Sequence, residues 1–185
     1  MNPDGLGECL PTLHGDGLLL RPLTEQDAPA VFDLFGDPDV VRFMALRRLE
    51  TPSDAIELIA AIRRDFDTGR LYQWGIERDR LIVGTCTLAG IDRRHRRAEL
   101  GFAVLTRLWG QRILSGSFPV VIAFAFERLR LHRLEADVEP SNLRSMRALE
   151  RAGFRREGVL RERYFQEGEA QDAIVYGLLE KEWRG

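Results

Sequence analysis

The stretch LTRLWGQRILSGSFPVV, residues 105–121, contains residue types that could bind an anion such as a pyrophosphate. Gly110 lies just before a segment that is expected to be helical, and the N–H groups at a helix N-terminus have no partner within the helix and attract phosphate. A small residue would suit position 112, because phosphate oxygens approach the backbone closely in such loops. Arg112 stands there instead. Its guanidinium could turn outward and donate to phosphate, or it could fill the pocket.

Pro119 raises a second question about the same segment. Inside a helix that begins near residue 112 it removes one hydrogen bond and clashes with the carbonyl four residues earlier, at a cost of about 3 kcal/mol. If the regular helix begins near Phe118 with Ser117 as its cap, proline is tolerated, but the helix N-terminus moves away from Gly110. The sequence leaves both arrangements open, a kinked but usable helix and a displaced loop.

Glu99 is the first candidate for a general base. In the predicted strand 98–105 it alternates with Gly101 and Ala103, whose small size leaves space beside the carboxylate. An ordinary structural or substrate-orienting glutamate fits the same pattern. The three histidines are scattered, and no His, Cys or Asp spacing indicates a metal site.

The elements that must position these residues follow from periodicity and capping signals. Residues 1–16 are rich in Gly, Pro and Asp and are expected to form a loose arm, and residues 17–185 a single domain. Helices are expected at 25–35, from Thr51 to Gly69, over 109–130, and from a cap at Ser141 to about Ala152. Strands are expected at 17–23, 71–77, 81–91, 98–105 and 132–138, with a closing pair, 154–165 and 172–183, around the turn QEGEA. This order predicts a mixed α/β sheet with helices on both faces.

The composition excludes several classes of protein. The chain has 185 residues, a net charge of −2 and 44% hydrophobic residues, which is typical of a globular domain that does not bind nucleic acid or anionic membranes. The basic run DRRHRR, 92–97, is interpreted as a solvated hairpin tip. No apolar run approaches the ~20 residues that span a bilayer, so a cytoplasmic location is expected. Cys9 and Cys86 do not make a disulfide framework.

Four segments in order resemble the Gcn5-related N-acetyltransferase (GNAT) family, in the RimJ/RimL-like branch of ribosomal-protein N-terminal acetyltransferases. Each segment alone is a weak signal, whereas four in the right order with matching gaps are a strong one. The segments are LLLRPLTEQDAPAVFDLFGDPDVVRFM (18–44), AELGFAVLTRLWGQ (98–111), LHRLEADVEPSNLRSMRALERAGFRREGVLRER (131–163) and DAIVYGLLEKEW (172–183).

The resemblance implies a largely antiparallel, seven-stranded sheet that opens in a V between its fourth and fifth strands, 98–105 and 132–138. It implies that acetyl-CoA lies in this opening as the co-substrate, and that no metal is needed. The implied cofactor-binding residues are Phe102, Ala103 and Val104 along the pantetheine, Arg107, Leu108, Trp109, Gly110, Gln111 and Arg112 around the pyrophosphate, and Asn142 on the following helix.

Acetyl transfer also needs an oxyanion donor and a proton for the leaving thiolate. Backbone N–H groups around Val104 are the natural oxyanion donors. By resemblance, Ser145, one turn after Asn142, takes part in proton transfer; because a hydroxyl is a poor acid, a hydrogen bond to the cofactor sulfur is the preferred role. Tyr164 is a more acidic donor if it points inward, and an aromatic packed on the sheet if it does not.

These observations predict an N-acetyltransferase that moves an acetyl group from acetyl-CoA to a primary amine by direct attack. The acceptor is expected to be a protein N-terminal α-amine or a small amine, and an α-amine with a pKa of about 7.7–8.0 needs little help from a base. The alternative is a non-catalytic GNAT-fold binding or dimerisation protein whose CoA loop is impaired by Arg112 and Pro119. Exposed sheet edges would also allow a homodimer.

Overall fold

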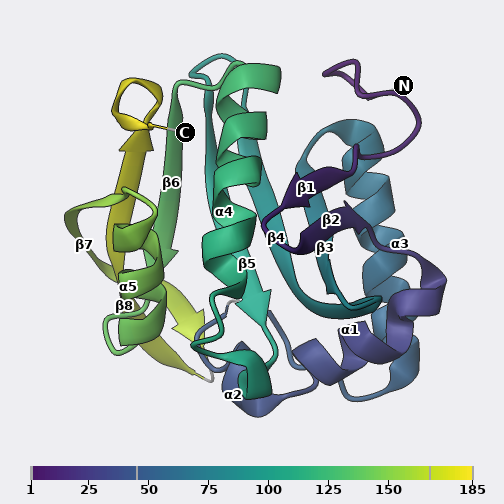
Figure 1. The fold of residues 1–185 in the computed structure, drawn as a ribbon. Helices are drawn as coiled ribbons and strands as arrows, with labels where there is room; N and C mark the ends of the chain where they lie inside the picture. The colour runs from purple at the N-terminus through teal and green to yellow at the C-terminus, as the bar shows by residue number, and fades with distance from the viewer. Residues whose placement is uncertain (1, 45, 167, 185) are drawn as a thin grey trace.

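The computed structural model describes residues 2–44, 46–166 and 168–184, and its centre is one eight-stranded sheet (Figure 1). The strand order is β1-β2-β3-β4-β5-β6-β8-β7. Neighbouring strands are antiparallel except β5 and β6, which are parallel. The strands are β1 (Leu13–Gly15), β2 (Leu18–Pro22), β3 (Leu71–Arg78), β4 (Leu81–Asp92), β5 (Arg97–Val104), β6 (Arg133–Val138), β7 (Arg155–Gln166) and β8 (Glu169–Leu179).

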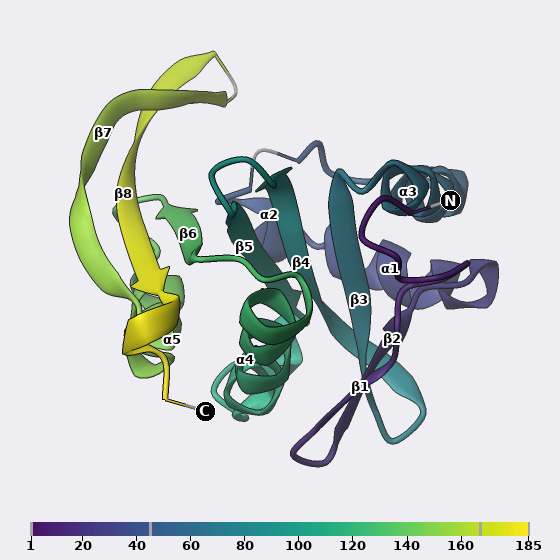
Figure 2. The same ribbon diagram turned by 90° about the horizontal axis from the view of Figure 1, so that it is seen from above.

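Helices cover both faces of the sheet (Figure 2). The helices α1 and α3 lie on one face, and α4 and α5 lie on the other (Figures 1 and 2). In the described ranges no helix is long and apolar enough to cross a membrane. The α-helices are α1 (Ala28–Phe35), α2 (Pro38–Val41), α3 (Pro52–Thr68), α4 (Ile113–Ala123) and α5 (Leu143–Arg151); α4 continues as a π-helix over Phe124–Arg128, and 3-10 turns span Glu25–Asp27, Thr106–Leu108 and Glu180–Glu182.

The capping signals around α3 work as predicted. The Thr51 hydroxyl accepts a hydrogen bond from the Asp54 N–H, and the Asp54 carboxylate accepts one from the Thr51 N–H at 2.9 Å. Pro52 occupies the first helical position, where its missing N–H costs nothing. Gly69 ends the helix in the left-handed conformation, with φ of 66°.

The first sixteen residues differ from the expected loose arm. Residues Leu13–Gly15 pair with β2 and add an eighth strand to the seven expected. Asn2 is buried and donates to the Phe66 carbonyl, and the Tyr72 hydroxyl donates to Asp4. The Asn2 and Asp4 contacts were hidden from the sequence, because each is made to a residue far along the chain.

The C-terminal third differs from expectation in two details. Asn142, rather than Ser141, caps α5, because the Ser141 hydroxyl donates to Glu139 instead. Strands β7 and β8 extend into the expected turn QEGEA, 166–170, whose second residue, 167, lies outside the described residues.

Helix α4 begins at Ile113, so the alternative with a helix start near Phe118 is wrong. Pro119 lies inside the helix and is exposed. The Ser117 hydroxyl is buried and donates to the Ile113 carbonyl at 2.8 Å. The predicted apolar helix over 109–130 is therefore shorter at its start, and its last part is π-helical.

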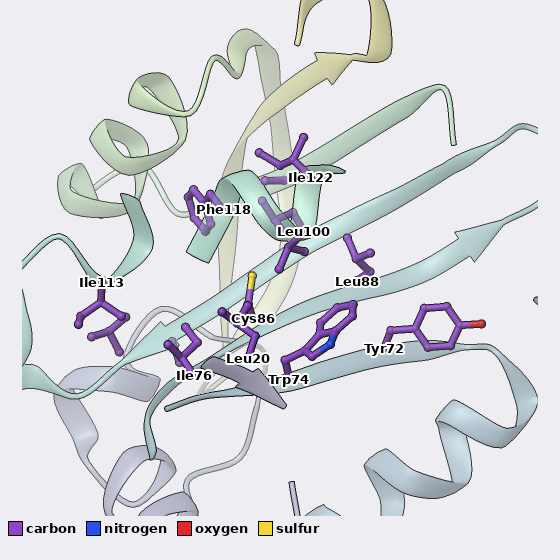
Figure 3. Close-up of a cluster of buried hydrophobic side chains, with 14 of the residues drawn as sticks. Leu20, Tyr72, Trp74, Ile76, Cys86, Leu88, Leu100, Ile113, Phe118 and Ile122 are labelled. Atoms are coloured by element: carbon purple, nitrogen blue, oxygen red, sulfur yellow. The ribbon is translucent and has the colours of Figure 1, made fainter. Parts of the chain in front are cut away.

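The core between the sheet and α4 is a cluster of buried apolar side chains (Figure 3). The ring of Phe118 on α4 meets that of Phe102 on β5 at 5.0 Å between centroids, close to perpendicular, which is a favourable geometry for aromatic pairs. This packing fixes the position of α4, and hence of its N-terminus, relative to β5. The labelled core residues are Leu20, Tyr72, Trp74, Ile76, Cys86, Leu88, Leu100, Ile113, Phe118 and Ile122.

Candidate active site

The sheet opens between β5 and β6. These two strands pair only from Arg97↔Arg133 to Glu99↔Glu135. Past Glu99 each strand runs on without the other, and residues of both line one cavity. The predicted V-shaped opening between strands 98–105 and 132–138 is therefore confirmed.

The backbone of β5 faces this opening where the pantetheine was expected. The Leu105 N–H donates to the Val83 carbonyl at 3.0 Å. Hydrogen bonds alternate along an antiparallel pair, so the N–H and C=O groups of Phe102 and Val104 turn away from β4 and toward the opening. The indole N–H of Trp109 donates to the Val104 carbonyl at 2.8 Å, in agreement with this orientation. The N–H of Val104 remains a candidate oxyanion donor.

The loop before α4 has an open backbone. Gly110 has φ of 81°, and a Cβ placed there would meet no atom within 4 Å. Arg112 is the residue before α4 and has φ of 62°, a left-handed conformation that costs a non-glycine residue about 1–2 kcal/mol. Arg112 is exposed and is among the residues that line the cavity at the opening. A small residue was expected at position 112. The arginine found there adopts the left-handed backbone conformation that glycine usually adopts.

One cavity of about 1960 Å³ extends from this loop through the opening to the far face of the sheet. It is large enough for a nucleotide thioester and an acceptor together. Arg107 and Gln111 are outside its lining: the Gln111 amide donates to the Arg107 carbonyl at 3.2 Å and accepts from Arg78. The other predicted cofactor residues line it: Phe102, Ala103, Val104, Leu108, Trp109, Gly110, Arg112 and Asn142.

Glu99 lies on the side of the sheet that faces α3. Its neighbour Gly101 leaves space as predicted, since a Cβ there would meet only the Thr87 Cβ at 3.6 Å. The Glu99 side chain is open to the cavity, yet the protein around it raises its pKa. The main cause is desolvation by the cavity walls, which exclude part of the water although the side chain stays accessible. The Asp137 carboxylate adds to the rise in pKa, and the Arg163 guanidinium opposes it.

Asp137 organises a cluster that the sequence analysis missed. Its carboxylate accepts hydrogen bonds from the Tyr164 hydroxyl and from Nε of Arg163, both at 2.9 Å, and its side chain is only 7% exposed. Burial and the bond to Asp137 raise the pKa of Tyr164 to about 12. Tyr164 lines the cavity, as the donor interpretation requires, but its proton points at Asp137. The alternation of polar residues in HRLEADV was the available signal for Asp137.

Helix α5 brings Asn142 and Ser145 to the cofactor side of the cavity. The Asn142 side-chain oxygen accepts from the Ser145 N–H at 3.2 Å. Among the described residues the amide nitrogen has no hydrogen-bond partner, in keeping with the predicted pantetheine contact. The Arg144 guanidinium lies 4.3 Å from the ring centre of Trp109, so the start of α5 contacts the loop.

A second missed contact ties the loop to Asp37, the residue before α2. The Thr106 hydroxyl donates to the Asp37 carboxylate at 2.9 Å, and the same side chain caps α2 through the Asp39 N–H. The start of the loop is therefore fixed by hydrogen bonds to the N-terminus of α2 and to β5.

Comparison with known proteins agrees with this geometry. The profile of the family described as "Acetyltransferase (GNAT) domain" matches residues 17–155. The "Uncharacterized N-acetyltransferase YoaA" of Bacillus subtilis is 34% identical over 171 residues, covering 91% of this chain and 97% of YoaA. The "Putative ribosomal N-acetyltransferase YdaF" of the same organism is 30% identical over 140 residues, covering 74% and 76%. The solved structure of Mycobacterium smegmatis RimJ with CoA-disulfide has a TM-score of 0.86 at 23% identity, covering 98% and 91%.

Proposed function

Because the chain belongs to the GNAT family of acetyl-CoA-dependent N-acetyltransferases, we propose that its acceptor is the α-amine of a peptide or protein N-terminus, which attacks the acetyl thioester directly. The non-catalytic alternative depended on a blocked or displaced CoA loop. Helix α4 begins beside the loop, and the Arg112 side chain is exposed. The loop therefore suits the pyrophosphate of acetyl-CoA, which supplies the acetyl thioester.

The observation that carries the proposal is the continuity of the cavity. The same opening is lined by Gly110 and Asn142 on one side of the sheet and by Glu99 and Gln73 on the other. An acceptor amine that enters beside Glu99 can thus reach a thioester held along β5 directly. The acetyl group need not pass through a protein side chain. Direct attack needs such a meeting point, because proximity and orientation supply much of the rate enhancement.

The available nucleophiles also favour direct attack. Cys86 is fully buried, and burial raises the pKa of its thiol to about 12. Neither Cys86 nor Cys9 is among the residues that line the cavity. A cysteine acyl-enzyme therefore has no suitable residue in the part of the chain that the structure describes.

In the proposed reaction the acceptor nitrogen bonds to the acetyl carbon and the carbon–sulfur bond breaks. Glu99 takes the proton that the amine loses, directly or through water. The Val104 N–H stabilises the developing oxyanion. The Ser145 hydroxyl stabilises the leaving thiolate by a hydrogen bond, and solvent supplies its proton.

The α-amine is the preferred acceptor because its pKa of about 7.7–8.0 gives a useful neutral fraction near pH 7. The similarity to a relative named as a ribosomal N-acetyltransferase supports this choice. A small cationic amine is the second candidate, since Asp65, Glu99 and Asp172 all line the acceptor side of the cavity.

The test uses a panel of short peptides that contain an internal lysine and start with different residues. Each peptide is offered with acetyl-CoA in a free form and in an N-formylated form, and spermidine is offered separately. Acetylation of the free α-amines alone, located by fragmentation mass spectrometry, is the expected result. Turnover of spermidine without any peptide would support the second candidate. Acetylation of lysine in the formylated peptides would overturn the choice of α-amine.

A further inference from the structure

Helix α5 carries three arginines on the side that faces the cavity. Arg144, Arg147 and Arg151 are spaced by three and four residues, so they share one helix face. All three are exposed and all three line the cavity. We call these three residues the α5 arginine row.

The row starts at the CoA loop. Arg144 stacks on Trp109 at 4.3 Å, which places the first turn of α5 directly against the loop. A helical turn rises about 5.4 Å, so Arg147 and Arg151 lie about one and two turns farther along the same side of the cavity. Arg112 lines the cavity from the loop itself.

The positive charge of the row is not neutralised locally. Among the described residues, Arg147 and Arg151 have no ion pair or hydrogen bond. The nearby carboxylates have other partners: Glu150 accepts from the Tyr176 hydroxyl at 3.0 Å, and Glu182 pairs with Arg155 at 3.0 Å. Unpaired guanidinium groups beside a nucleotide cavity are suited to a phosphate dianion.

We propose that Arg147 and Arg151 bind the 3′-phosphate of coenzyme A and make the protein select the 3′-phosphorylated coenzyme. The backbone amides around Gly110 suit the pyrophosphate, and the ribose 3′-phosphate is then the coenzyme's remaining anionic group. A row that begins at the loop and runs away from it offers guanidinium groups where this second phosphate can reach them. This proposal rests on the coenzyme and not on the acceptor, so its failure would leave the proposed acceptor untouched.

The experiment compares the binding of coenzyme A and 3′-dephospho-coenzyme A by calorimetry, without acceptor or turnover. Hydrogen bonds to charged groups contribute about 1.5–3 kcal/mol, so wild-type protein is expected to bind coenzyme A about 10- to 100-fold more tightly than the dephospho form. In the double variant Arg147→Gln/Arg151→Gln this ratio should fall below about threefold, while the affinity for the dephospho form stays within about twofold. The affinity for coenzyme A should also lose part of its salt dependence.

A matched control is Arg64→Gln. Arg64 is an exposed helical arginine on α3 that does not line the cavity, and its loss should leave both affinities unchanged. Thermal unfolding of each variant checks the fold, which should persist because the replaced side chains are exposed. Equal binding of the two coenzymes by wild-type protein would overturn the proposal. An equal loss of affinity for both coenzymes in the folded double variant would do the same.

Discussion

Strand β5 (Arg97–Val104) has two faces with opposite roles. On one face Leu100 is 2% exposed, and Phe102 packs on Phe118 of α4. On the other face Glu99 and Gly101 open onto the cavity, with a carboxylate and empty space in place of packed carbon. Because side chains alternate along a strand, one short segment can be rigid on one side and reactive on the other.

Because of this contrast, even-numbered residues of β5 should mainly affect stability, and odd-numbered residues should mainly affect activity. The packed face, from which Phe102 also lines the cofactor side of the cavity, holds the strand and α4 in place. The face of Glu99 and Gly101, which we call the cavity face, uses the resulting fixed position for chemistry. Substitutions on the packed face should lower the free energy of unfolding. Substitutions on the cavity face should change rates or binding with little effect on folding.

The largest effect is expected from Leu100→Ala on the packed face. Truncation of a buried leucine removes apolar contacts and leaves a cavity, so the free energy of unfolding should fall by about 3 kcal/mol. Urea denaturation measures the change, and the slope of the transition should stay constant. A loss below about 1 kcal/mol would mean that this face can collapse around the deletion and is not the rigid support inferred here.

Glu99→Gln on the opposite face should leave stability unchanged and lower kcat. General bases contribute typically 10²–10⁴-fold, and the low α-amine pKa places the expected loss at the lower end, about 100-fold. Steady-state kinetics with a free-amine peptide measures kcat, and calorimetry measures the affinity for acetyl-CoA, so an effect on catalysis can be told from an effect on cofactor binding. Unchanged turnover would leave Glu99 as an ordinary surface glutamate. A parallel loss of acetyl-CoA affinity would assign it to the cofactor instead.

Arg112→Gly tests whether the guanidinium at the end of the loop between β5 and α4 contributes to acetyl-CoA binding. Glycine adopts φ of 62° without strain, so the backbone should be kept while one cationic group is lost. An exposed charge interaction contributes up to about 1 kcal/mol, so acetyl-CoA should bind roughly fivefold more weakly at low salt, and the difference should shrink at high salt. Tighter binding would show that the guanidinium obstructs the site.

Most elements, and the open space beside Glu99, could be predicted because their signals are local. Apolar runs separated by charged turns indicated β3 to β5. The capping residues at Thr51 indicated the start of α3, and the small residues beside Glu99 indicated open space. The strand Leu13–Gly15 was missed because three residues carry too little periodicity to stand out from a Gly-rich segment. The conformation of Arg112 was missed because φ above zero is uncommon for residues other than glycine.

The Asp137 cluster could not be predicted, since it depends on strand register. Between Leu160 and Tyr164 the pairing of β7 with β8 shifts, and Glu162 adopts φ of 52° within the shift. This irregularity brings Arg163 and Tyr164 onto a carboxylate 26 and 27 residues earlier in the chain. A bulge of this kind moves side chains relative to the partner strand, and local hydropathy does not reveal it.

The smallest expected effect is a change in pH dependence on the cavity face. Glu99 acts as a base only when ionised, so kcat/KM should rise with pH through its raised pKa. Asp137→Asn removes a negative charge that raises this pKa, so the acidic limb of the profile should move to lower pH while the plateau stays the same. Asparagine keeps an oxygen for Tyr164 and Arg163, and Glu135→Gln should shift the limb in the same direction by less, because Glu135 contributes less to the raised pKa. The acceptor α-amine adds a limb of its own near its pKa of about 7.7–8.0, and this limb should persist in Glu99→Gln. A lower limb that moves to higher pH in Asp137→Asn, or that persists in Glu99→Gln, would show that another group of the protein titrates.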